Sequence, residues 1–140
     1  MRALLIATMV IASLSSMAQD KTDSWKVTLN SKVLLNTSTE DPTKNIIKIK
    51  SSDLKKSGYF EVKYKDAEPS SWIRSFTLND EKDAELLRKD SSSTFKLPLS
   101  ALRKVFMSKK QITIYTILAP PNSMMGVRIR RIHLCTLRIS

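Results

Sequence analysis

Glycine, cysteine and histidine are scarce in this sequence of 140 residues, which has two glycines, one cysteine and one histidine. Gly58 and Gly126 lie far apart, so the chain can form neither a P-loop nor a GxGxxG turn. The single cysteine, Cys135, excludes an internal disulfide framework and the cysteine-rich zinc motifs. The single histidine, His133, excludes the HExxH motif. These scarcities remove nucleotide-binding loops, disulfide scaffolds and the common zinc enzymes from consideration.

Long hydrophobic runs are also few, and the clearest one stands near the N-terminus. Arg2 precedes a mostly apolar run from Ala3 to Leu14, which is well short of the ~20 residues that a membrane-spanning helix needs. Ser16 and Ala18 then place small residues at positions −3 and −1 of a cleavage site. We therefore predict that residues 1–18 are a secretory signal peptide. The mature chain, which has no predicted transmembrane segment, should be exported to the periplasm, the cell envelope or the medium.

Short runs in which apolar and polar residues alternate dominate the rest of the chain, and this period of two is typical of half-buried strands. Ser51–Gly58 and Ser100–Ser108 show helical features, the first with Ser and Gly as expected caps. Asn79–Lys89 begins acidic and ends basic, so a short helix is an alternative there. The patterns predict a mostly β fold, a single-domain antiparallel β-sandwich of about seven or eight strands with one or two short helices, over residues 19–140. The predicted strands are Trp25–Leu29, Val33–Leu35, Asn45–Lys50, Phe60–Tyr64, Trp72–Leu78, Phe95–Leu97, Gln111–Ala119 and Val127–Ile139.

Two strands carry specific expectations about side-chain direction. In the last strand the apolar residues switch from odd to even positions, which predicts a bulge near Arg130–Arg131. In an earlier strand Trp72, Arg74 and Phe76 share one face. If that face is exposed, it forms an aromatic platform with a cation between the rings. We favour a covered face, in which Trp72 and Tyr64 belong to the core and Trp72→Ala costs about 3–5 kcal/mol.

Basic residues outnumber acidic ones, 24 to 13, and the excess is concentrated in the C-terminal third. Thr94–Ser140 contains nine Lys and Arg residues and no Asp or Glu. Such a charge attracts an anionic polymer, a lipid surface or an acidic protein, but it predicts no sequence-specific recognition of nucleic acid. The alternative is that these bases pair with acids from the N-terminal part of the chain. The candidate anion-binding residues are Lys109, Lys110, Arg128, Arg130, Arg131 and Arg138.

His133 and Cys135 are two residues apart on a predicted strand, so both should point the same way. They define the alternative function, a small secreted hydrolase. A cysteine nucleophile also needs an orienting group and an oxyanion site, and a metal needs further ligands; neither is visible. The acidic segment 80–85 could contact Ca²⁺, but it lacks the spacing of an EF-hand loop. We therefore predict no catalytic residue, no metal and no cofactor.

Three segments resemble short exported proteins of Bacteroidota: Val127–Leu137, the Ala18–Gln19 junction and Trp72–Phe76. The resemblance implies export from a bacterial cell and implies no particular activity or site. The lack of a glycine-rich loop, of paired carboxylates and of triad elements beyond one histidine, together with the charge distribution, favours an exported, non-enzymatic binding or interaction protein. The basic C-terminal third of that protein would meet an anionic partner or an envelope surface.

Overall fold

The computed structural model describes residues 22–68, 70–107, 109–121 and 129–140. Within these ranges the chain forms nine β-strands and two short helices, which confirms the predicted mostly β fold. The predicted signal peptide and Arg128 lie outside the described residues. The helices are α1 (Ser51–Leu54) and α2 (Leu99–Phe106), and the strands are β1 (Ser24–Leu29), β2 (Lys32–Thr37), β3 (Ile46–Ile49), β4 (Tyr59–Lys65), β5 (Ile73–Asn79), β6 (Glu85–Lys89), β7 (Thr94–Pro98), β8 (Gln111–Ala119) and β9 (Arg131–Ile139).

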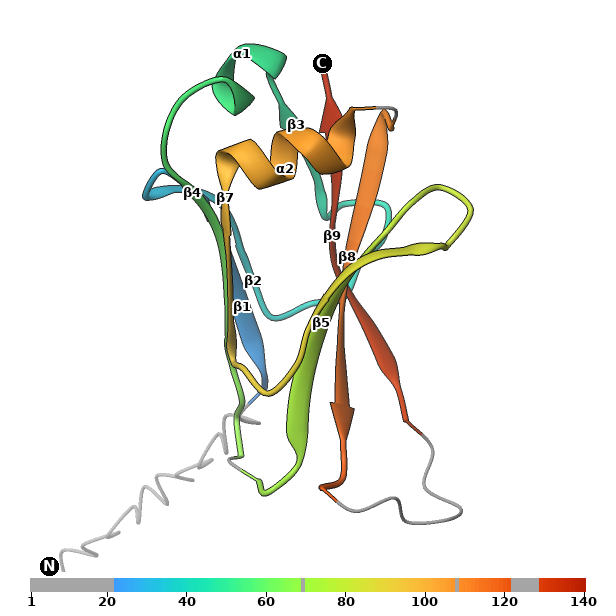
Figure 1. Cartoon of the computed structure of the whole chain (residues 1–140). Helices are drawn as coiled ribbons and strands as arrows, with labels where there is room; N and C mark the ends of the chain where they lie inside the picture. Colours follow the sequence, from blue (N-terminus) through green and yellow to red (C-terminus); the bar gives the residue numbers. More distant parts are fainter. Residues whose placement is uncertain (1–21, 69, 108, 122–128) are drawn as a thin grey trace, which may run out of the picture.

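The strands form two sheets that face each other (Figure 1). One sheet has the order β2-β1-β4-β7 and is antiparallel throughout. The other has the order β3-β9-β8-β5-β6 and is antiparallel except for the parallel pair β3–β9. The predicted sandwich is confirmed, but with more strands than expected and one mixed sheet. Because β3 enters its sheet by a crossover rather than a hairpin, no local turn requires it to run antiparallel to its neighbour.

Both helices lie on connections that cross between the sheets. Helix α1 connects β3 to β4, and α2 connects β7 to β8. Figure 1 shows them at one end of the sandwich, where α2 bridges the two sheets. Helix α2 buries Leu99, Leu102 and Phe106, which share one face of a helix. We call this the helical end; it also holds the start of β8 and the end of β9, where Ile139 N–H donates to the carbonyl of Lys110 over 3.2 Å.

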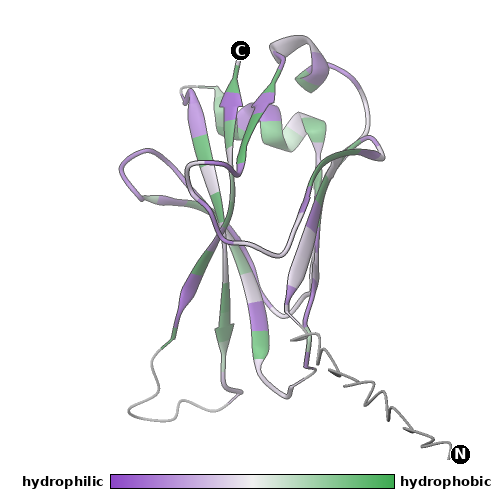
Figure 2. Ribbon diagram, turned by 180° about the vertical axis from the view of Figure 1, so that it is seen from behind, coloured by the Kyte–Doolittle hydropathy of each residue, from purple (hydrophilic) through white to green (hydrophobic). Residues whose placement is uncertain are grey.

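The core fills the space between the two sheets. Strands β1, β4 and β7 alternate buried and outward-facing side chains, and Figure 2 shows the hydrophobic and hydrophilic residues alternating along the strands. Phe76 of β5 and Phe95 of β7 come from opposite sheets and are buried, with ring centroids 5.9 Å apart. Aromatic and aliphatic side chains from both sheets thus pack in the core, as expected for a β-sandwich.

Trp72 does not belong to the core, so this prediction and the cost derived from it are wrong. Trp72 is 38% exposed, because β5 begins at Ile73 and Trp72 lies just before the pairing with β8. Arg74 and Phe76 are buried, and so is Tyr64, as expected. With two of its three members covered, the exposed aromatic platform does not form.

Residues 79–89 form a turn and a strand rather than the alternative helix. The carboxylate of Asp80 accepts hydrogen bonds from the backbone N–H groups of Lys82 and Ala84, each 2.9 Å long. Asp83 has a φ of 63°, which no α-helix contains. Side-chain bonds to the local backbone thus favour the turn, and β6 returns to pair with β5.

The caps predicted for the first helix are also wrong. The residue before α1 is Lys50, and no side chain caps that end of the helix. Gly58 lies beyond the end of α1 and has a φ of 131°, so it belongs to the turn that leads into β4. The glycine is used for a backbone conformation there and not for ending the helix.

The bulge in β9 lies at Leu134, not near Arg130–Arg131 as predicted. The register with β8 shifts between Ile114 and Tyr115, and this shift leaves Leu134 without a cross-strand partner. The predicted position lies at the very start of the strand. The carbonyl oxygen of Leu134 instead accepts the indole N–H of Trp25 from the other sheet, a partner that is remote in sequence.

Candidate anion-binding surface

The structure separates the predicted anion-binding residues into two groups. Lys109 and Lys110 precede β8, and Arg138 is near the end of β9, so these three lie at the helical end. Arg130 and Arg131 lie at the opposite end of the same strand pair. Because antiparallel pairing places the start of one strand beside the end of the other, the length of the strands separates the two groups. The backbone positions of the two groups are therefore apart, although the side chains of Lys109 and Arg131 both reach acids of the β5–β6 turn, Asp80 and Asp83.

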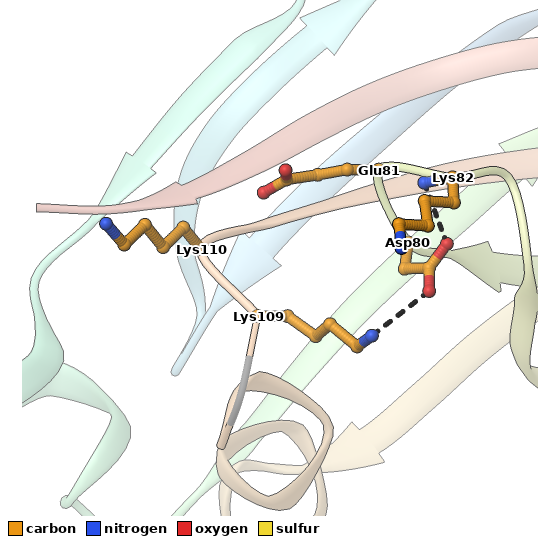
Figure 3. A pocket seen from close by; sticks show the side chains of 5 residues that line it. All are labelled: Asp80, Glu81, Lys82, Lys109 and Lys110. Carbon is orange, nitrogen blue, oxygen red and sulfur yellow. Dashed lines mark hydrogen bonds and ion pairs between the residues drawn. The ribbon is translucent and has the colours of Figure 1, made fainter.

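Lys109 is paired with an acidic residue of the N-terminal part. Its ammonium nitrogen is 3.1 Å from the carboxylate of Asp80, a contact that Figure 3 shows beside Lys110. The backbone N–H of Ala84 and the Lys109 ammonium hold the pKa of Asp80 below its usual range. This ion pair anchors the β5–β6 turn at the helical end, so much of the charge of Lys109 is already matched within the fold.

Both described arginines at the other end are paired as well. Arg130 binds the carboxylate of Glu40. Arg131 contacts the two carboxylate oxygens of Asp83 at 2.9 and 3.0 Å, and its guanidinium lies 3.8 Å from the ring centroid of Tyr115. Lys109 and both of these arginines therefore pair with acids of the N-terminal part, which was the alternative considered from the sequence.

His133 and Cys135 point to opposite faces of the five-stranded sheet. His133 pairs with Tyr115 and Cys135 with Ile114. Consecutive residues of β8 point in opposite directions, so their partners across the bulge do the same. The expectation that the imidazole and the thiol share a side is wrong, and the structure does not bring them together as a catalytic pair.

The surroundings of these two groups also favour structural roles. Cys135 lies in the core and is fully buried, which raises the pKa of its thiol. His133 is buried on the other side of the sheet, where its Nε2 is 2.8 Å from the hydroxyl of Thr136, and burial lowers its pKa. Neither environment activates a nucleophile.

The outer face of the four-stranded sheet carries lysines that the sequence analysis did not single out. Lys26 of β1 lies directly opposite Lys63 of β4, and Lys65 lies two residues further along β4. All three side chains are exposed, because the alternate positions of both strands fill the core. Like charges opposite one another destabilise a sheet. This cluster therefore costs stability and presents a net positive charge to solvent, although Glu61 partly balances Lys63.

The same face continues along β4 to Tyr59. The ammonium nitrogen of Lys96, on β7, lies 4.4 Å from the ring centroid of Tyr59, a residue that is 50% exposed. Glu61 lies opposite Lys96 and is 3.3 Å from the ammonium of Lys63. It is the only carboxylate on the four strands of this sheet as the structure describes them.

Tyr59 also borders an open hollow of about 500 Å³ at the helical end, which we call the α1–α2 hollow. Lys55 and Lys56 follow α1, Arg103 belongs to α2, and all three line the hollow. The face of the sheet and the hollow thus meet at Tyr59. We call the exposed bases of this combined surface the basic face, which consists of Lys26, Lys55, Lys56, Lys63, Lys65, Lys96 and Arg103.

Most of the basic face was missed because it comes from the part of the sequence whose charges nearly balance. The available signal was the alternate spacing of Lys63 and Lys65 in a clear strand, which places both on one side. The contribution of Lys26 depends on the pairing of β1 with β4. The contribution of Arg103 depends on the position of α2 beside the segment that follows α1. Neither arrangement can be read from the sequence around these residues.

Comparisons with known proteins returned no match, since no family model, no curated protein and no solved structure matches this chain. In the described ranges, no three His, Cys, Asp or Glu side chains form a group that could hold a metal ion. Neither helix in the described part of the chain has the length and apolar character needed to cross a membrane.

Proposed function

We propose that this protein is an exported, non-enzymatic binding protein that holds an anionic partner on its basic face. The observation that carries the proposal is the surface itself, on which the cross-strand pair Lys26–Lys63 continues through Lys96 to the α1–α2 hollow. A cluster of one sign raises the local concentration of oppositely charged ligands. We thus keep the anionic partner expected from the sequence, but we place most of its binding residues outside the C-terminal third, Thr94–Ser140.

A linear anionic polymer fits the shape of this face. The bases and Tyr59 follow β4 over its seven residues, and a strand rises about 3.3 Å per residue, so the row is roughly 20 Å long before it reaches the hollow. Lysine ammonium groups are hydrated point charges that impose little geometry. Binding along the sheet should therefore be weakly selective and should weaken steeply as the salt concentration rises.

Export is supported by the N-terminal sequence. A positive start, a short apolar run and the small residues Ser16 and Ala18 are typical of a signal peptide. When the chain is expressed with its natural N-terminus in a bacterial host, the intact mass of the exported protein should correspond to a chain that begins at Gln19. A product that retains Met1 would reject the export part of the proposal.

Retention on immobilised heparin across a salt series tests the binding part. The double variant Lys26→Glu with Lys63→Glu should elute at markedly lower salt than the natural protein, because four units of charge change where the polymer lies. Removing the negative charge of Glu61 in Glu61→Gln should shift elution the other way. Far-ultraviolet circular dichroism of each variant checks that the sandwich is folded.

Two matched double variants separate the basic face from the overall net charge. Lys44→Glu with Lys89→Glu changes the charge equally at exposed positions outside the basic face. Lys110→Glu with Arg138→Glu tests two residues predicted from the sequence. If all three double variants elute together, retention reflects net charge alone and the basic face is not the site. The largest loss in the Lys110/Arg138 variant would return the site to the C-terminal third.

A further inference from the structure

The α1–α2 hollow differs in charge from the hollow beside Lys109. Its volume is about 500 Å³, and its lining includes Lys55, Lys56, Ser100 and Arg103. No Asp or Glu is among the described residues that line it. The hollow beside Lys109, shown in Figure 3, has two carboxylates in its wall. Of these two basic concavities, the α1–α2 hollow is the one with no carboxylate among its described lining residues.

Arg103 has hydrogen-bond donors that the fold does not use. Its Nη1 lies 3.5 Å from the carbonyl oxygen of Leu54, the last residue of α1. None of the ion pairs among the described residues includes Arg103 or Lys55. A guanidinium group has five N–H donors in a planar fork that matches the oxygens of phosphate or sulfate. The remaining donors of Arg103 are therefore open to a ligand in the hollow.

The two lysines add charge that can adjust to a ligand. Lys56 contacts Asp53 at 3.1 Å, but its side chain is 65% exposed, so exchanging this partner for a ligand costs little. Lys55 is exposed and lines the hollow from the same segment. The start of α2 adds no donor from its first residue, because the N–H of Leu99 is already bonded to the carbonyl of Gly58.

The wall of the hollow between Ser57 and Tyr59 is rigidly held. The side-chain amide of Asn30 donates to the carbonyl of Ser57 over 3.1 Å and accepts from the N–H of Tyr59 over 3.0 Å. The carbonyl of Gly58 accepts from Leu99 N–H over 2.9 Å. A Cβ at Gly58 would lie 1.6 Å from the Oδ1 of Asn30, so this position requires glycine. A fixed wall lowers the entropy lost on binding.

We propose that the α1–α2 hollow binds one tetrahedral oxyanion, a phosphate or a sulfate group, with Arg103 as the principal ligand and Lys55 and Lys56 as additional charges. This inference rests on the proposed function, since the oxyanion is taken to be a substituent of the anionic partner on the basic face. The sheet lysines attract the partner by charge, whereas the hollow recognises one group on it by shape and directed hydrogen bonds.

The test is a nuclear magnetic resonance titration of the ¹⁵N-labelled mature protein with inorganic phosphate and, separately, inorganic sulfate at constant ionic strength. We expect saturable shifts of the backbone amides of residues 55–59 and 100–103. Arg103→Gln should weaken binding by about ten-fold, equivalent to ~1.4 kcal/mol. Lys104→Gln is the matched control, because Lys104 is the adjacent exposed base of α2 outside the lining, and it should change binding by less than about two-fold. The anion that binds more tightly identifies the group.

Heparin retention of the same variants distinguishes failure of this inference from failure of the proposed function. Shifts that do not saturate, or equal weakening by Arg103→Gln and Lys104→Gln, overturn the oxyanion site. The proposed function stands in that case if Lys26→Glu with Lys63→Glu still reduces retention. If that double variant leaves retention unchanged while both anions bind with the expected Arg103 dependence, the hollow is a site for a free oxyanion and the polymer-binding function is rejected.

Discussion

The indole N–H of Trp25 donates a hydrogen bond to the carbonyl oxygen of Leu134, which lies 3.0 Å away in the opposite sheet. The bulge in β9 takes Leu134 out of register with β8, so this carbonyl finds its partner across the core. The Trp25 ring also stacks on Tyr64, with ring centroids 5.9 Å apart and planes within 4°. Trp25 thus links the two sheets by a hydrogen bond beside the bulge and packs on Tyr64 within its own sheet.

Replacing Trp25 with Phe should therefore destabilise the protein. The substitution leaves the buried carbonyl of Leu134 without its donor, at a cost of about 1–3 kcal/mol, and the smaller ring adds to that cost. The measurement is urea unfolding followed by circular dichroism. Trp72→Phe is the matched control: Trp72 is 38% exposed, so its replacement should change stability by no more than about 0.5 kcal/mol. Equal effects at the two positions would contradict this view of the core.

Arg74 is a buried cation whose charge is matched by Asp66 and by an aromatic ring. Its guanidinium forms an ion pair with Asp66, donates to the hydroxyl of Thr116 over 2.9 Å and lies 3.6 Å from the ring centroid of Tyr64. The side chain of Arg74 is 5% exposed, whereas that of Asp66 is 31% exposed. If the ion pair is broken, water can therefore solvate the Asp66 carboxylate much better than the Arg74 guanidinium.

This asymmetry predicts unequal costs when the ion pair is broken. Asp66→Asn leaves an uncompensated buried charge and should cost about 3–5 kcal/mol. Arg74→Met leaves only a carboxylate that water can reach, so it should cost less. In the Arg74→Met background, Asp66→Asn should have little further effect. Unfolding of the four proteins of this double-mutant cycle decides the matter, and additive single effects would show that the two residues do not act as a pair.

His133 should make stability depend on pH in the mildly acidic range. Burial lowers its pKa in the folded state, while Glu40 and Asp41 oppose the shift, so the unfolded chain binds the proton more readily. Stability should be complete above the unfolded pKa of about 6.5 and should fall below it as the pH decreases, by at most ~1.4 kcal/mol per pH unit. His133→Gln should flatten this dependence between pH 5 and 7. A natural protein equally stable at both ends of that range would contradict the expectation.

Cys135 should be inert in the folded protein. It is fully buried and its thiol pKa is raised, so little thiolate reaches a reagent. A chromogenic disulfide reagent should label it only as fast as the protein opens, and labelling should become rapid in denaturant. Labelling of the native protein at the rate of an exposed cysteine would instead reopen the Cys–His enzyme hypothesis.

Individual elements show why much of the fold could be predicted. The expected strand Gln111–Ala119 has the bounds of β8, and the alternation at Phe60–Tyr64 falls within β4. Alternating apolar and polar residues indicate which side chains are buried, because one face of a strand packs against the core. Trp72 shows the limit of this reasoning: its place in the pattern was correct, but the pairing with β8 begins one residue later. Where a strand starts depends on a partner that no local pattern contains.

The candidate site was harder to predict, because charge is counted along the chain but acts through space. By itself the sequence determined the strand-rich architecture, the scarcity of catalytic motifs and the excess of positive charge. Only the tertiary structure decided where that excess is exposed. It pairs Lys109, Arg130 and Arg131 with acids from distant segments and places Lys26 opposite Lys63. Ion pairing requires contact, and salt screens exposed charges over about 10 Å, so strand pairing and crossovers decide which bases remain available to a ligand.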